Sequence, residues 1–517
     1  MQMLSRAVSI VGFDRLLLVG IGISLMVPAI YLLEHNQWRL LVMLVSVGSL
    51  ILLWRLNRTL AICMTFTYLF LLGDVRRIVS MFAGQTGLDP LLLVGALFTL
   101  YIGLPLFRGL RLQDRLSKTM LALLGIMILE MLNPKQGSVL VGLSAGLFYI
   151  VPVLWFWISR RFGTERLCFL LLFRVVVPLG VVAALLGLYQ TFIGFLPWES
   201  AWIENAIAAG YNALYLTGRH VRSFGFSVNG VEYVSLLVVT TILLCSAVIA
   251  GRRAYILPIP LVASAIFFAA TRGAILRVLF GVAVVWAVRG YTRNRASFVP
   301  RLLFAVTLGV SALAYSSSQA SSDEGPYVDP RTASTSQAAT QHVVQGFAHP
   351  LDAKSSTAGA HAGMFSSGIM TGLTNPVGSG LGSVTLGADK FGGSGGSTEI
   401  DISDAFYTMG IVGGLCFVYM IYLTFRYAFG YLVSGDKVIG YSVIGVLAAM
   451  IGTWIGQGQY GLAPFVCFCI GFLAKKHLEA KAEHRATPST IKDDLAPSQF
   501  RRTSKPARVQ EAMNGLP

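Results

Sequence analysis

Continuous apolar runs of roughly 16–24 residues recur along the chain, and they constrain its fold more than any other feature. Runs of this length can cross a bilayer as helices and are too long for the strands of a membrane barrel. The 517 residues are 55% hydrophobic and only 12% charged, whereas a soluble domain carries about 25% charged residues. Because lipid offers the backbone no hydrogen-bond partner, the sequence predicts an all-α polytopic membrane protein.

The apolar runs predict about fourteen transmembrane helices, of which two are short enough to leave a range of about 12–14. The expected spans are residues 15–33, 38–54, 59–72, 90–107, 118–132, 138–157, 167–190, 231–250, 254–270, 273–289, 301–316, 403–425, 438–455 and 459–474. The first is followed at once by another run and is expected to be a signal anchor.

The spans and the links between them define four regions. Residues 1–316 hold transmembrane helices 1–11 and a long loop at 193–230, and residues 317–402 form a second, larger loop. The C-terminal spans fill residues 403–475, and the polar tail 476–517 is expected to be disordered in the cytoplasm.

Arginines between the spans predict the orientation of the chain. The net charge is +16, which on a soluble protein would indicate nucleic-acid binding; here the arginines lie singly or in small groups beside apolar runs, as in topology control. The positive-inside rule places both termini in the cytoplasm, and it places the loops 193–230 and 317–402 and the 73–89 link outside. The cation-rich cytoplasmic links hold Arg55 with Arg58; Arg108, Arg111 and Arg115; Arg160, Arg161 and Arg166; Arg252 with Arg253; Arg289, Arg293 and Arg295; and Arg426 with Lys437. No nucleic-acid partner is expected.

Local composition divides the two long outer loops further. Trp198 and Trp202 give 193–230 the character of an interfacial, partly helical segment. In the larger loop, Ser316 to Ala339 is expected to be mostly flexible and Gly359 to Leu373 to form a helix, followed by a glycine-rich turn at 376–382.

Three arginines on the predicted outer face are candidates for binding an anion. Arg219 and Arg222 precede the span that begins near Val231, and Arg272 lies at the turn before the span 273–289. Guanidinium groups stay charged and bind phosphate oxygens in bidentate fashion, so the three side chains are expected to hold a pyrophosphate at the bilayer surface. The alternatives are a surface or salt-bridged arginine at 222 and a snorkelling side chain at 272.

His220, Asp401 and Asp404 are candidates for a general base that takes a proton from a hydroxyl group. The neighbouring arginines would keep His220 neutral, and the two carboxylates stand at the outer mouth of the span 403–425. A surface histidine and a helix N-cap at Asp404 are the alternatives. The other histidines predicted outside are His35, His342, His349 and His361.

No metal or cofactor site is expected from the sequence. The spacing of histidines and carboxylates matches no metal site, and all six cysteines fall in or beside apolar runs without the spacing of a zinc or redox motif.

Four short segments occur in an order that is found in a known family. Arg222-Ser223-Phe224-Gly225-Phe226-Ser227-Val228-Asn229 precedes a span, and Thr271-Arg272-Gly273-Ala274 follows two spans later; the large loop carries Pro376-Val377-Gly378-Ser379-Gly380-Leu381-Gly382, and the next span opens with Gly410-Ile411-Val412-Gly413. Over residues 167–430 this layout resembles the O-antigen ligase and Wzy-type polysaccharide polymerase superfamily of bacterial envelope membranes. Arg219 to Gly230 also has the arginine-to-glycine spacing described for some polymerases.

The resemblance implies a metal-independent glycosyltransferase of the bacterial inner membrane that needs no cofactor. Its donor would be an oligosaccharide on undecaprenyl pyrophosphate, gripped by Arg219, Arg222 and Arg272, and its product a surface or exopolysaccharide at the periplasmic face. Membrane lipids are expected partners, and a flippase and a chain-length regulator are candidate partners.

One departure favours a polymerase over a ligase. Ligases of the family place a catalytic histidine before the Gly-Ile-x-Gly span, and residues 397–407 contain no histidine. The base is therefore expected to be Asp401, Asp404 or His220, unless the transfer proceeds without a base. A ligase that transfers glycan to a lipid or protein, a polysaccharide flippase or transporter, and a membrane scaffold without catalytic activity remain the alternatives.

Overall fold

The computed structural model describes residues 35–84, 89–208, 216, 220–292, 294–305, 307, 333–349, 358–385, 388, 391, 398–456 and 459–486. The expected span at 15–33, much of the one at 301–316 and the tail beyond 486 thus lie outside the described residues. The chain forms two units, 1–478 and 479–517, and every contact given below belongs to the first.

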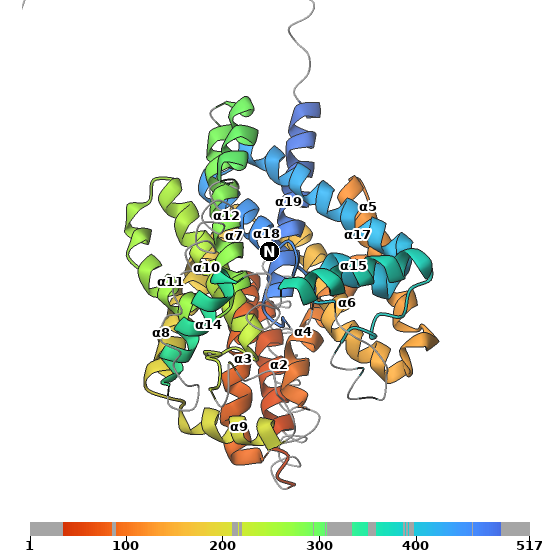
Figure 1. Cartoon of the computed structure of the whole chain (residues 1–517). Helices are drawn as coiled ribbons and strands as arrows, with labels where there is room; N and C mark the ends of the chain where they lie inside the picture. Colours follow the sequence, from red (N-terminus) through yellow and green to blue (C-terminus); the bar gives the residue numbers. More distant parts are fainter. Residues whose placement is uncertain are drawn as a thin grey trace, which may run out of the picture. The chain divides into compact units, whose positions relative to one another are not determined.

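Helices are the only regular elements of the described part (Figure 1). In chain order they are α2 (Trp38–Leu56), α3 (Arg58–Ala83), η1 (Pro90–Leu92), α4 (Leu93–Gly103), η2 (Leu104–Phe107), α5 (Arg115–Met131), η3 (Pro134–Gln136), α6 (Val139–Phe162), α7 (Glu165–Leu170), η4 (Leu171–Val176), α8 (Val177–Phe192), α9 (Pro197–Ala208), α10 (Gly230–Ile249), η6 (Arg253–Ile256), α11 (Ile259–Phe268), α12 (Arg272–Tyr291), η7 (Arg295–Ser297), α14 (Thr335–Ala348), α15 (Ala358–Thr374), α17 (Asp401–Ser434), α18 (Lys437–Ala449) and α19 (Leu462–Ala486).

The length and apolar character of these helices make the chain an all-α, multi-pass membrane protein. Within the described residues, 8 helical stretches are long and apolar enough to span a bilayer, and the stretches 253–268 and 437–449 are apolar but shorter. Large apolar side chains such as Leu52 on α2, Leu279 on α12 and Val412 on α17 are exposed. Such side chains are costly in water and expected against lipid.

The core lies around α10 and around an aromatic cluster between α3, α6 and α19. Of the 18 residues that form the most apolar stretch of α10, 83% are buried, against 11% in α2. α10 is therefore an inner helix and α2 a peripheral one. The rings of Phe66 and Trp155 are 4.7 Å apart, and Phe468 lies 5.9 Å from Phe66. Trp155 donates from Nε1 to Thr99 Oγ1 at 3.0 Å, which satisfies its one polar atom.

The expected turn at 376–382 is confirmed, and it fits a break in α17. Gly410 has φ 65° and ψ −169° inside this helix, a conformation that glycine adopts without strain. The break leaves carbonyl groups without helical partners, and the turn supplies donors: Ser379 N bonds Tyr407 O at 3.0 Å, and Gly380 N bonds Thr408 O at 3.1 Å.

Replacement of Gly410 by alanine should destabilise the fold. A Cβ at this position would overlap the Pro376 carbonyl, and φ is in the left-handed region, so we expect a loss of about 1–3 kcal/mol. Gly430 lies in the same helix with nothing near its missing Cβ, and Gly430→Ala is the matched control. Thermal unfolding in detergent compares the two; equal midpoints would show that the break is not constrained.

The described part of the large loop contains the helices α14 and α15, of which the sequence predicts only α15. The helix expected at Gly359 to Leu373 is confirmed as α15. The flexible character expected for Ser316 to Ala339 is wrong from Thr335 onward, because α14 begins there with a capping box: Ser334 Oγ accepts from Gln337 N at 3.2 Å, and Gln337 Oε1 accepts from Ser334 N at 2.9 Å.

The expected outer link at 73–89 also differs from the structure. α3 continues to Ala83, so most of this link is a helical extension of the third span. The extension is a regular helix with polar side chains, and these polar residues end the apolar run from which hydropathy predicts a span.

Candidate functional site

The segment before α10 is held in place by the side chains of Gln190, which is buried, and Asn229, which is half-buried. Gln190 Oε1 accepts from Phe224 N at 3.0 Å and from Gly225 N at 2.8 Å. Asn229 Oδ1 accepts from Glu232 N at 2.8 Å and so caps α10. The backbone of 223–229 is therefore fixed by hydrogen bonds. Arg219 lies outside the described residues, and its expected role stays a prediction.

Arg222 and Arg272 lie close together, as the sequence analysis expects. Burial lowers the pKa of Arg222, and the positive charge of Arg272 lowers it further. Arg222 Nε is buried without a hydrogen-bond partner. Two neighbouring guanidinium groups repel each other, and a bound anion would offset that repulsion.

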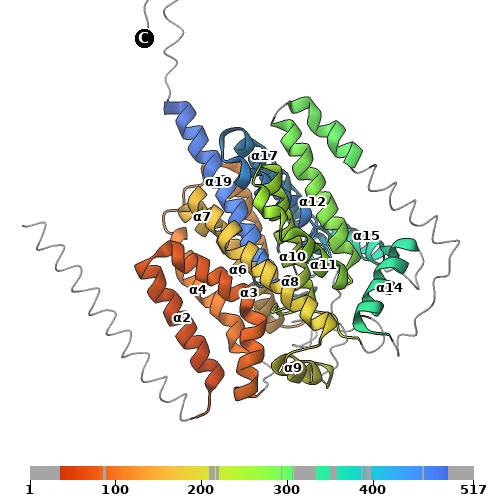
Figure 2. The ribbon, with the colours of Figure 1, turned by 90° about the vertical axis from the view of Figure 1, so that its left-hand side faces the viewer.

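A strained turn presents Arg272 at the start of α12. Ala270 has φ 54°, a left-handed conformation that is uncommon for any residue with a side chain. Ala270 is buried against Ala338, Ala339 and Val343 of α14. The small apolar face of α14 thus packs on the α11–α12 turn, and Figure 2 shows α14 beside α11 and α12.

His342 and Gly346 lie on this same face of α14, four residues apart. The Arg272 guanidinium packs against Gly346 so closely that a Cβ there would overlap it. Burial first, and then the charges of Arg222 and Arg272, lower the pKa of His342 to about 4. His342 is therefore neutral at pH 7, beside two cations. We name Arg222, Arg272 and His342 the basic cluster.

His220, expected as a base, lies beside the first turn of α14. Its Nδ1 lies 3.2 Å from Thr335 Oγ1, and its carbonyl accepts from Leu216 N at 2.7 Å. The contact with Thr335 joins the segment before α10 to the first turn of α14. These bonds connect the segment before α10 with α14, and the expected catalytic role of His220 stays a prediction.

Asp401 and Asp404, the other expected bases, are buried at the start of α17 and bond to backbone and hydroxyl donors. Asp401 Oδ2 accepts from Ile455 N at 2.8 Å. Asp404 Oδ1 accepts from Thr398 N at 3.0 Å and from Thr398 Oγ1 at 2.5 Å. Carboxylates in such positions stabilise a helix N-terminus. Their expected catalytic role stays a prediction.

His342 and Arg277 are residues of interest that the motifs in the sequence do not single out. Nothing in the local sequence of His342 distinguishes it from the other histidines predicted outside. Arg277 lies about one and a half turns beyond Arg272 in α12, and its Nη1 is 3.4 Å from Ser235 Oγ and 3.5 Å from Thr453 Oγ1. An arginine inside the predicted span 273–289 was a readable signal, because intramembrane charges are candidates for function.

Among the described residues, no group of three or more His, Cys, Asp or Glu side chains is arranged to hold a metal ion. No family model, no curated protein and no solved structure matches the chain. What the protein does must therefore be inferred from the chemistry of its own residues.

Proposed function

We propose that the chain is a membrane glycosyltransferase that polymerises oligosaccharide repeats carried on undecaprenyl pyrophosphate. The observation that supports this most is the basic cluster, in which a neutral histidine lies beside two arginines at the end of membrane helices. Paired guanidinium groups match the charge and geometry of a pyrophosphate, and a neutral histidine can accept a proton. The combination suits a transfer reaction with an anionic leaving group.

In the proposed reaction, a hydroxyl oxygen of the acceptor repeat forms a bond to the anomeric carbon of the donor glycan. The bond between that carbon and the lipid pyrophosphate oxygen breaks, and the electron pair leaves with the pyrophosphate. The hydroxyl proton passes to His342. Arg222 and Arg272 stabilise the negative charge that grows on the leaving group, which is where electrostatic catalysis acts.

The proposed setting is the inner membrane of a bacterium, with about 12–14 spans and both termini in the cytoplasm. The alternation of cationic links supports this orientation. It would put the basic cluster on the periplasmic side, where lipid-linked repeats await polymerisation.

A ligase that transfers finished glycan to a lipid or protein is the second candidate. The position of His342 favours it, because the resemblance implies a catalytic histidine for ligases and the expected stretch before Gly410 has none. His342 on α14 would then act as the catalytic histidine, although it lies earlier in the large loop than the resemblance implies.

Glycan analysis of cells that lack the protein separates these candidates. For a polymerase, single repeats should remain on the lipid carrier at the outer face while long chains disappear. Accumulation of long chains on the carrier would identify a ligase instead. Repeats confined to the cytoplasmic leaflet would identify a flippase and exclude the proposed reaction.

A further inference from the structure

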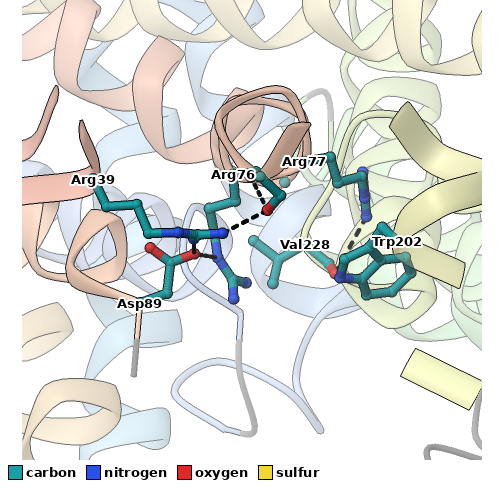
Figure 3. Close-up of a pocket in the computed structure, with 8 residues that line it drawn as sticks. Arg39, Arg76, Arg77, Asp89, Trp202 and Val228 are labelled. Carbon is teal, nitrogen blue, oxygen red and sulfur yellow. Dashed lines mark hydrogen bonds and ion pairs between the residues drawn. The ribbon is translucent and has the colours of Figure 1, made fainter. Parts of the chain in front are cut away.

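A second group of arginines surrounds a pocket at the end of α3, and the basic cluster does not include it. Figure 3 shows the pocket, which is lined by Arg39, Gly73, Arg76, Arg77, Ser80, Asp89, Trp202 and Val228 and encloses about 330 Å³, part of it open to solvent. We name it the α3 pocket. Its residues come from α2, α3, α9 and the segments before η1 and α10, so several elements must fold together to form it.

One carboxylate in this pocket serves two arginines. Asp89 Oδ2 lies 2.9 Å from Arg39 Nη1 and 2.6 Å from Arg76 Nε. Arg77 pairs with Asp74 at 3.1 Å. The charge of the buried Glu199 carboxylate also acts on Arg77, so the three guanidinium groups are matched by three carboxylates.

Arg77 is buried and rigidly held. Its side chain is 2% exposed, its Nη2 donates to Ser227 O at 2.6 Å, and its guanidinium lies 4.1 Å from the Phe224 ring centre and 4.7 Å from that of Trp202. The Nε atom of Arg77 is buried without a hydrogen-bond partner. An unsatisfied donor of a buried charged group is costly, and a ligand oxygen or a water near the pocket would satisfy it.

Arg76 presents the accessible side of the pocket. Its side chain is 25% exposed, and among the described residues its only side-chain partner is Asp89 through Nε. Figure 3 shows the rest of its guanidinium directed away from the dashed contacts. The two terminal nitrogens are thus available as a fork for two oxygens.

A purely structural role accounts for only part of this arrangement. Arg39 fastens α2 to α3 and to the following link by donating to Ser80 Oγ at 2.8 Å and to the Gly84 carbonyl. One arginine and Asp89 would suffice for that connection. This connection does not explain why Asp89 also pairs with Arg76, whose terminal nitrogens are accessible. It also does not explain why the Nε atom of Arg77 is left without a hydrogen-bond partner.

We propose that the α3 pocket binds an oxyanion, a phosphate or a carboxylate group, through Arg76 with support from Arg77. The bound group would be the phosphate of an anionic lipid headgroup or the carboxylate of an acidic sugar. This proposal does not depend on the proposed glycosyl transfer, because its test measures binding of the anion and not transfer of a glycan.

The site lies beside the basic cluster and is separate from it. Arg77 bonds to Ser227, and Arg222 begins the same short segment that Gln190 holds at Phe224. An anion on Arg76 and Arg77 would sit against one end of this segment while the lipid pyrophosphate occupies the other. Two anionic groups of one glycolipid substrate, or a substrate and a headgroup, can therefore bind on either side of it.

The test compares Arg76→Gln with its parent in a full-length Arg222→Ala background, in which the basic cluster is disabled as a second phosphate site. Thermal unfolding at low ionic strength, in a non-ionic detergent, is followed against inorganic phosphate, glucuronate and glucose. We expect phosphate or glucuronate to stabilise the parent and glucose to have no effect. Arg76→Gln should lower the affinity for the anion about tenfold or more. Native mass spectrometry from nanodiscs then compares retained phosphatidylglycerol with phosphatidylcholine.

The outcomes distinguish the source and can reject the site. Retention of phosphatidylglycerol that Arg76→Gln abolishes assigns a lipid headgroup, and stabilisation by glucuronate that the same change abolishes assigns an acidic sugar. Arg253→Gln removes an exposed arginine from the stretch 253–256 and controls for net charge; Arg76→Lys controls for folding. If Arg76→Gln and Arg253→Gln bind phosphate, glucuronate and both lipids as their parent does, the pocket is a structural ion-pair network only.

Discussion

Replacement of Arg222 or Arg272 by alanine should abolish glycan elongation while the protein accumulates at its normal level. Loss of one preorganised donor to a developing anion typically lowers the rate about 10²–10³-fold, which would leave no detectable long chains. Thermal unfolding of each variant in detergent shows whether the fold is kept, because only the Nε atom of Arg222 is without a hydrogen-bond partner. Elongation is measured by gel analysis of glycan from proteoliposomes supplied with the lipid-linked donor.

Lysine at either position should restore only part of the activity. It keeps the charge but lacks the planar fork that holds two phosphate oxygens. Arg253→Ala, which removes an exposed arginine elsewhere in the chain, is the matched control and should elongate glycan normally. Full activity in both Arg222→Ala and Arg272→Ala would reduce the two arginines to packing or topology features.

Gly346→Ala offers an independent approach to the same cluster. The change touches no charged group, yet its Cβ would displace the Arg272 guanidinium. Gly363 lies in α15 with open space around it and should accept alanine without loss. Reduced elongation by Gly346→Ala alone would show that the position of Arg272, and not just its charge, matters.

The sequence predicts some of the membrane helices closely, because these depend on local composition. The runs 38–54 and 231–250 correspond to α2 and α10 within a few residues, since an apolar run must be helical in lipid. The turn at 376–382 was also readable, because Gly378 and Gly380 supply the positive φ angles that it needs.

The candidate site could be predicted only in part, because its members meet through tertiary packing. Arg222 and Arg272 were identifiable as cations at span ends on one predicted face. His342 was not, because its place beside them depends on the small face of α14 packing against the α11–α12 turn. Hydropathy carries no signal for such a contact between distant segments.

Replacement of His342 by glutamine should lower turnover about 10²–10⁴-fold, the usual contribution of a general base. Binding of the lipid-linked donor should persist, because Arg222 and Arg272 remain. His349 ends the same helix and is exposed, so His349→Gln is the matched control and should keep full turnover. Equal rates for the two variants would return the search for the base to Asp401, Asp404 and His220.

The pH dependence of the wild type gives this assignment a readout that a structural role would not produce. The pKa of His342 is about 4 in the free protein, so the imidazole is neutral above that pH, and kcat/KM should fall only as the pH approaches 4 from above. A bound pyrophosphate offsets the charges of Arg222 and Arg272 and favours the protonated imidazole. The acidic limb of kcat should therefore lie at higher pH than that of kcat/KM, and His342→Gln should lose both limbs. An acidic limb that persists in His342→Gln would assign the titration to another group and remove His342 from the proposed reaction.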